Sequence, residues 1–151
     1  MASLLIVAHA PLATALKSVA CHAFPEQAGT MRAVDVLETD SPEVVEARLR
    51  ALLPAGASED VLILADVFGA TPCNAAMRVA DGVHSRVVSG VNVPMIWRAL
   101  CYGQEPLDAL VARAVGGATQ GVMQLAATRP QNQGVPPGQA SHDQDQHHHQ
   151  Q

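Results

Sequence analysis

The sequence is short of lysine and of aromatic residues. Lys17 is the single lysine among 151 residues, and the aromatic side chains are one Trp, one Tyr and two Phe. A Walker-type phosphate loop needs Gly-Lys-Ser/Thr, and no glycine precedes Lys17 in its helical segment. A nucleic-acid surface needs a basic stripe and usually stacking rings, whereas the formal net charge here is -5. We therefore expect neither a nucleotide loop nor a nucleic-acid partner.

Cysteine is also scarce. The three cysteines, Cys21, Cys73 and Cys101, are widely spaced and form no C-x-x-C motif, which disfavours a disulfide framework and a zinc site. We expect them to be small buried hydrophobic residues of a reduced protein. Residues 1–8 lack a basic segment, and their apolar run is too short for a signal peptide or a membrane span. A cytoplasmic location without membrane insertion is the expectation.

Composition divides the chain near residue 128. Hydrophobic residues make up 48% of the whole sequence and charged residues 15%, which is typical of a chain that buries a core. Residues 129–151, in contrast, are rich in Gln, Pro and His with almost no aliphatic side chains. Such a segment buries too little to offset the entropy of ordering. We predict one folded domain over 1–128 and a disordered tail over 129–151, whose histidines are expected to serve no metal site.

Short apolar runs alternate with helical periods. Residues 4–8 and 61–65 are continuously apolar, as in parallel strands buried on both faces, and residues 31–37 and 86–88 are weaker strand candidates. Apolar side chains recur at helical spacing between these runs. Helix starts are indicated by a hydroxyl or acidic residue directly before a proline, at Ser41-Pro42, Thr71-Pro72 and Glu105-Pro106.

This order predicts an α/β fold with an open, mostly parallel four-stranded sheet and helices on both faces. Ligands of such sheets bind beyond the carboxyl ends of the strands, which selects the loops at residues 9–11, 66–70 and 90–94. Gly116-Gly117 is expected to interrupt the last helix. Residues 120–126 then become a candidate for a late strand at the edge of the sheet.

His9 and Asp66 each follow an apolar strand directly. Adjacent parallel strands would bring the two side chains together, near helix N-termini that favour a phosphate. A carboxylate bonded to one imidazole nitrogen fixes the tautomer and leaves the lone pair of the other nitrogen free. His9 is therefore a candidate nucleophile and Asp66 the residue that orients it.

Other residues of these loops are candidates for lining the site. Thr71 is expected to cap the following helix while its hydroxyl faces the same crevice. Gly69 is expected to form a turn, with Asn74 bracing the loop, and Ala10 follows the candidate nucleophile directly. Asn92, which precedes Val-Pro, suits a turn as well as a ligand.

Two blocks carry a resemblance. Residues 66–74 (DVFGATPCN) and residues 90–95 (GVNVPM) resemble the mannose-type enzyme IIA component of the bacterial phosphoenolpyruvate-dependent sugar phosphotransferase system, over roughly residues 3–126. The resemblance implies that His9 is the phosphorylated histidine, that Asp66 is its hydrogen-bonding aspartate and that Thr71 lines the site. It also implies a homodimer that exchanges an additional antiparallel strand, for which residues 120–126 are suited.

The resemblance further implies a phosphoryl carrier that needs no cofactor or metal. His9 would accept phosphate from the phosphocarrier protein HPr and pass it to a IIB-type acceptor. The sequence departs from the family in two places. Ala10-Pro11 stands where the family often has glycine, which is expected to stiffen the loop without touching the reacting nitrogen. A Gln/His-rich tail stands where transport members often continue into a IIB domain, which leaves a regulatory use of the phosphorylation state open. A non-catalytic flavodoxin-like or receiver-like binding module is the alternative, and a hydrolase using Cys73 or Thr71 is a third.

Overall fold

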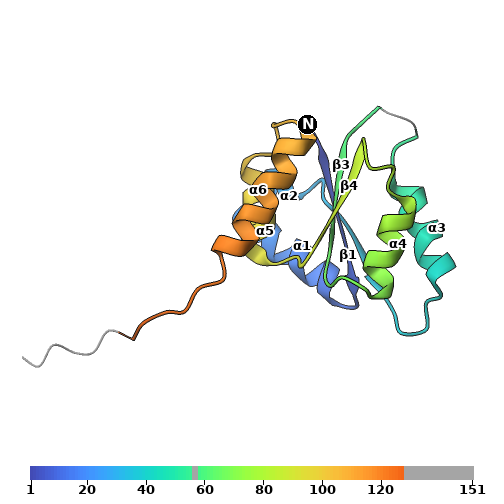
Figure 1. The fold of residues 1–151 in the computed structure, drawn as a ribbon, viewed down its shortest axis with the longest axis horizontal. Coiled ribbons are helices and arrows are strands. Elements are labelled where there is room, and N and C mark those ends of the chain that lie inside the picture. Colours follow the sequence, from blue (N-terminus) through green and yellow to red (C-terminus); the bar gives the residue numbers. More distant parts are fainter. Residues whose placement is uncertain (56–57, 128–151) are drawn as a thin grey trace, which may run out of the picture.

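The computed structural model describes residues 1–55 and 58–127 and shows a single sheet of four parallel strands (Figure 1). In spatial order the sheet reads β2-β1-β3-β4, and every neighbouring pair is parallel. The fold class predicted from the sequence is confirmed. The strands are β1 (Ser3–His9), β2 (Arg32–Val36), β3 (Val61–Ala65) and β4 (Ser85–Ser89).

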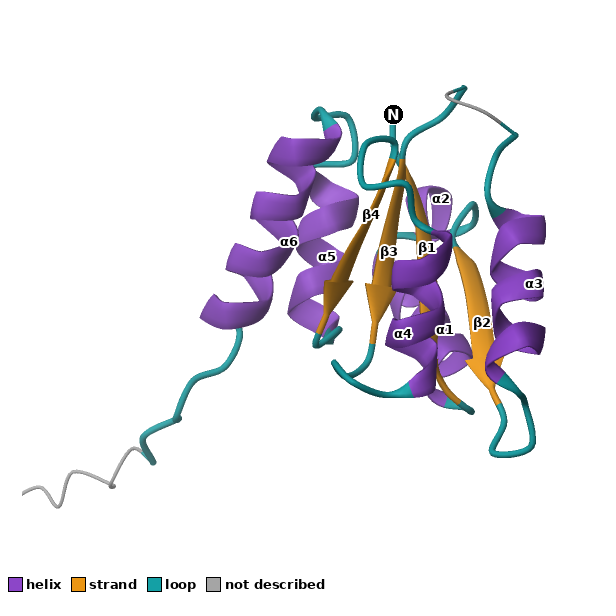
Figure 2. Ribbon diagram, turned by 45° about the vertical axis from the view of Figure 1, so that its right-hand side comes forward, coloured by secondary structure: helices purple, strands orange, loops and turns teal. Residues whose placement is uncertain are grey.

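Helices cover both faces of the sheet (Figure 2). One face carries α1 (Leu12–Ala23), α2 (Pro25–Ala28), α5 (Val93–Cys101) and α6 (Leu107–Gln120), and the other carries α3 (Pro42–Leu52) and α4 (Thr71–Val79). Alternate residues of β1 enter the two cores: Leu4 and Ile6 face the first, and Leu5 and Val7 face the second. The continuous apolar run of β1 therefore follows from burial on both faces.

The connections reverse direction at the centre of the sheet. The chain passes from β1 through α1 to its neighbour β2, and from β2 through α3 back across β1 to β3. The loops after β1 and β3 consequently leave on opposite faces and open a crevice at the carboxyl ends of these two strands. The topology places the end of β1 at His9 and the end of β3 at Ala65 in this crevice.

The last helix differs from its prediction. Gly116 and Gly117 lie inside α6, which continues to Gln120, and residues 122–127 adopt neither helix nor strand. The predicted interruption is therefore wrong, and within the single chain residues 120–126 add no strand to the edge of the sheet. Exchange of a strand with a second copy stays a prediction.

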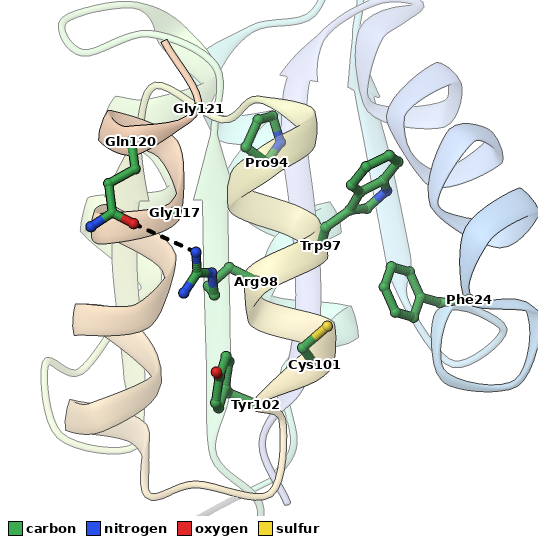
Figure 3. Close-up of a pocket in the computed structure, with 9 residues that line it drawn as sticks. All are labelled: Phe24, Pro94, Trp97, Arg98, Cys101, Tyr102, Gly117, Gln120 and Gly121. Atoms are coloured by element: carbon green, nitrogen blue, oxygen red, sulfur yellow. Dashed lines mark hydrogen bonds between the residues drawn. The ribbon is translucent and has the colours of Figure 1, made fainter. Parts of the chain in front are cut away.

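Close packing against α5 explains why residue 117 is a glycine. A Cβ atom at Gly117 would lie 2.6 Å from Cβ of Arg98 and 3.1 Å from the carbonyl oxygen of Pro94. Figure 3 shows α5 and α6 side by side at this point, with Arg98 and Gln120 joined by a hydrogen bond of 3.5 Å. A glycine is needed here so that the two helices can approach each other, and the helix tolerates it because packing outweighs propensity.

We expect Gly117→Ala to destabilise the protein by about 1–3 kcal/mol, since it forces an extra methyl group into a filled contact. Gly116→Ala is the matched control, because a Cβ there meets nothing within 4 Å and alanine should stabilise the helix by about 0.5–1 kcal/mol. Urea unfolding of the two variants measures the difference. Equal stabilities would show that the α5–α6 contact is looser than described.

The structure also tests predictions made for a helix cap and for the cysteines. The Ser41 hydroxyl accepts a hydrogen bond from the backbone N–H of Val44, as expected of an N-cap. Cys73 is buried and Cys21 partly buried, but Cys101 is exposed, so the expectation of buried cysteines is wrong for Cys101. The predicted tail over 129–151 lies outside the described residues. Among the helices that are described, none has the length and apolar character that crossing a membrane requires.

Candidate functional site

The structure brings His9 and Asp66 together. Oδ2 of Asp66 lies 2.6 Å from Nδ1 of His9 and accepts the His9 backbone N–H at 2.9 Å. The imidazole is open to solvent, with 55% of its side chain exposed, whereas the Asp66 side chain is 10% exposed. One ring nitrogen is therefore held by a fixed carboxylate while the ring as a whole stays accessible. The pairing predicted from the strand ends is present.

Asp66 is a carboxylate anchored from several sides. Burial alone would raise its pKa, but hydrogen bonds from the His9 backbone and ring and from the backbone N–H of Val67, together with the charge of His9, hold the pKa of Asp66 below its ordinary value. The Val67 N–H donates to Oδ1 at 2.8 Å. The aspartate is thus ionised at neutral pH, as orienting an imidazole requires.

The lowered pKa predicts a loss of stability in acid. A carboxyl group whose pKa is depressed in the folded state stabilises the fold above its unfolded pKa, about 3.9, and loses this contribution as the pH falls through the folded value. The pKa of Asp81 is also lowered, well below its usual range, by N–H donors from Val83 and Ser85.

We therefore expect the free energy of unfolding, measured with urea at a series of pH values, to fall on acidification below about pH 4. Asp66→Asn should reduce this pH dependence, and Asp66→Asn with Asp81→Asn should reduce it further. If the free energy of unfolding of the double variant fell with pH as steeply as that of wild type, the lowered pKa values of Asp66 and Asp81 would be contradicted.

Hydrogen bonds and a glycine turn shape the loop after Asp66. Gly69 has a φ of 88°, a left-handed conformation that favours glycine, and its carbonyl accepts the Asn74 side-chain amide at 3.4 Å. The Gly90 N–H donates to the Asp66 carbonyl at 3.1 Å. The turn predicted at Gly69 and the brace predicted for Asn74 are both observed, and the loops after β3 and β4 are joined at the site.

Thr71 does not cap α4. It is the first residue of that helix, the N-cap position belongs to Ala70, and no side chain caps the helix. The prediction of a capping hydroxyl is wrong because the turn places the threonine one residue inside the helix. The start of α4, which follows the Asp66 loop directly, consequently keeps free N–H groups with a positive dipole end.

The start of α1 is different, since a carboxylate already occupies it. Asp35 of β2 accepts the Thr14 backbone N–H at 3.1 Å and also the Thr14 hydroxyl. Asp35 thereby replaces the missing cap of α1, whose own N-cap residue is Pro11. Asp35 is not among the residues predicted from the sequence; the signal for it was one acidic residue within the otherwise mostly apolar run 31–37. Of the two helix starts, α4 is the better placed to receive an anion.

The remaining predicted residues have structural contacts. Ala10 is exposed and donates its N–H to the Val36 carbonyl at 2.9 Å. Asn92 is the N-cap of α5: Oδ1 accepts the Met95 N–H at 2.9 Å, and Nδ2 donates to the Ala118 carbonyl at 3.3 Å. Both polar ends of Asn92 are therefore engaged within the fold, and its contact with a ligand stays a prediction.

Two other kinds of site receive no support from the geometry. Burial raises the pKa of the Cys73 thiol and nearby Asp66 raises it further, although a contact with Gly69 lowers it; this disfavours Cys73 as a nucleophile. Within residues 1–55 and 58–127 no group of three or more potential ligands is placed to hold a metal ion.

A groove of about 450 Å³ lies between α5, α6 and the end of α1 (Figure 3), and its lining includes neither His9 nor Asp66.

The fold and the site define a class of protein: a parallel α/β domain with an accessible, carboxylate-oriented histidine at its topological switch point. The sequence model of the family described as PTS system fructose IIA component, where PTS denotes the phosphotransferase system, matches residues 3–115. The chain belongs to this family.

Individual relatives agree with this assignment. The mannose-specific EIIAB component of Escherichia coli K12 is 35% identical over 98 residues, which cover 62% of this chain and 30% of that protein. The chain thus spans less than a third of the curated relatives it matches. Among solved structures, the mannose/sorbose-specific IIA subunit of Enterococcus faecalis has a TM-score of 0.76 at 25% identity and covers 85% of this chain and 98% of its own. The EIIA component of Streptococcus agalactiae, at 22% identity, has a TM-score of 0.74 over 82% and 97% of the two chains and shows the same fold.

Proposed function

We propose that this protein is a phosphoryl carrier, in which His9 accepts a phosphoryl group from the phosphohistidine of HPr and passes it to a IIB-type acceptor. The observation that carries the proposal is the 2.6 Å contact between Nδ1 of His9 and Oδ2 of Asp66 in an open crevice. Membership in the IIA family supports it. The comparisons do not favour a flavodoxin-like or receiver-like binding module.

The geometry suggests which nitrogen reacts. With its proton on Nδ1, the imidazole donates to Asp66 and presents the lone pair of Nε2 to the incoming phosphorus. A bond forms between Nε2 and phosphorus while the bond between phosphorus and the donor nitrogen breaks, and its electron pair returns to the donor ring. The His9 ring gains positive charge in this step, and the ionised Asp66 carboxylate stabilises that charge.

Positioning and charge stabilisation carry most of such a transfer. The uncapped start of α4, with Thr71 as its first residue, supplies N–H groups to the phosphoryl oxygens in this proposal. Gly69 shapes the loop that leads to it. Because the phosphoryl group passes from the phosphohistidine of HPr to the free imidazole of His9, the transfer itself consumes no nucleotide, in keeping with the single lysine of the chain.

The test is to supply phosphoenolpyruvate, enzyme I and HPr and to follow incorporation of labelled phosphate. We expect label that is lost in acid and retained in base, and no label when HPr is omitted. Label that survives acid would indicate a hydroxyl ester and overturn the proposal. Subsequent addition of a IIB protein separates transfer to a permease from a regulatory use, because only the former discharges the label to IIB.

A domain ending near residue 128, a homodimer and a cytoplasmic location remain predictions that accompany this proposal. Sedimentation equilibrium measures the oligomeric state directly. The chain truncated after residue 119 is the informative comparison, since it lacks the segment predicted to exchange.

A further inference from the structure

The carboxyl edge of the sheet, where the open imidazole of His9 lies, also carries exposed apolar side chains. Phe68 is 73% exposed, Leu37 51%, Val67 50% and Leu12 39%; we call these four residues the apolar rim. They belong to the segments that follow β1, β2 and β3. Single exposed hydrophobic residues are ordinary, but a group of them beside a reactive residue marks an interaction surface.

Phe68 is the most exposed member of the apolar rim and also its largest. It lies two residues after Asp66 and directly before Gly69, whose left-handed conformation helps to turn the chain. The neighbouring Val67 N–H is fixed to the Asp66 carboxylate at 2.8 Å. A phenyl ring is therefore presented to solvent by a loop that is tied to the site itself. Aromatic side chains of this kind are enriched at the centres of protein interfaces.

The charges at this edge indicate what the rim binds. The segments 9–14, 36–40, 66–74 and 90–94 contain no lysine or arginine, whereas they contain Glu38, Asp40 and Asp66. Asp40 is paired with Arg48 of α3 at 2.9 Å, and Asp66 is bonded to His9. A small phosphate donor would meet no cationic side chain from these segments. A protein surface with apolar and basic side chains around its phosphohistidine, in contrast, complements both the rim and Glu38.

We infer that Phe68 is the docking anchor for the protein that donates the phosphoryl group, and that it contributes to binding this partner and not to the transfer step. The inference rests on the proposed function and names how the same site selects a protein donor. Truncating an aromatic side chain that is buried in an interface weakens binding by at least about 1–2 kcal/mol. This corresponds to about a tenfold loss of affinity.

The experiment measures the rate of phosphoryl transfer from phosphorylated HPr over a range of HPr concentrations. Phe68→Ser should lower kcat/KM about tenfold or more through a higher KM, with kcat within about twofold of wild type. Phe68→Trp should restore most of the loss. Val83→Ser is the matched control: Val83 is 65% exposed and lies two residues before the start of β4, at the opposite end of the sheet, so the KM of this variant should not change.

Two readouts separate docking from a general disturbance of the site. The spontaneous hydrolysis rate of isolated phosphorylated Phe68→Ser protein should equal that of wild type, and so should its stability to urea. A Phe68→Ser protein with the wild-type KM, or with a loss confined to kcat, overturns the inference. If wild type itself takes no phosphate from HPr, the proposed function fails and the inference fails with it; if wild type reacts and Phe68→Ser matches it, the inference alone fails.

Discussion

Replacing His9 with alanine is expected to abolish acid-labile phosphorylation by phosphoenolpyruvate, enzyme I and HPr. The substitution removes the nucleophile, and Asp66 alone offers no nitrogen lone pair in place of Nε2. The protein should still fold, because the imidazole is 55% exposed and the backbone N–H groups of residues 9 and 67 still reach Asp66. The measurement is the stoichiometry of label after a long incubation.

The chain contains its own control for this variant. His84 also places Nδ1 beside a carboxylate, 2.9 Å from Oδ1 of Asp60, but at the amino ends of β3 and β4. His84→Ala should label as wild type does. Labelling of His9→Ala at the wild-type level, or loss of labelling in His84→Ala, would place the reaction on another residue.

Replacing Asp66 with asparagine should slow phosphorylation by about 10²–10⁴-fold, the range expected when a group that controls an imidazole proton is lost. An amide has one oxygen and one N–H₂ group in place of two carboxylate oxygens, so it cannot accept the backbone N–H groups of His9 and Val67 and the ring Nδ1–H together, and the imidazole loses its fixed orientation. The amide also lacks the charge that stabilises the phosphorylated ring. Single-turnover transfer from phosphorylated HPr measures the rate, and kcat should fall with little change in KM.

Asp60→Asn is the corresponding control, since it alters the carboxylate beside His84 and leaves the His9 site intact. Its transfer rate should equal that of wild type. An Asp66→Asn rate within about threefold of wild type would contradict a role for this carboxylate in orienting His9, however short the contact between them.

The sequence predicted the fold through its buried strands. The apolar runs at 4–8 and 61–65 could be recognised because β1 and β3 are central and covered on both faces. The site could then be predicted from position. A histidine and an aspartate at the carboxyl ends of two adjacent parallel strands lie at the same edge of the sheet and therefore come close together. The short strands at the edges, β2 and β4, were weaker signals because each is less completely buried.

Features that depend on tertiary contacts were less predictable. Gly116-Gly117 suggests a helix break in isolation, but the second glycine is required where α6 packs on Pro94 and Arg98. The threonine before Pro72 has the pattern of a cap, whereas the turn after Gly69 shifts the cap to Ala70. Asp35, which lies in β2, accepts a hydrogen bond from the start of α1. The two segments are distant in the sequence, so no local pattern encodes that contact.

The most direct test of the proposed phosphoryl carrier is to identify the phosphorylated atom. Nitrogen-15 and phosphorus-31 NMR of the protein, phosphorylated through HPr, distinguishes the two imidazole nitrogens and assigns them to a residue by comparison with His9→Ala. We expect one phosphoryl group on Nε2 of His9, with Nδ1 protonated and bonded to Asp66. Phosphate on Nδ1 of His9, on another residue, or on none would contradict it.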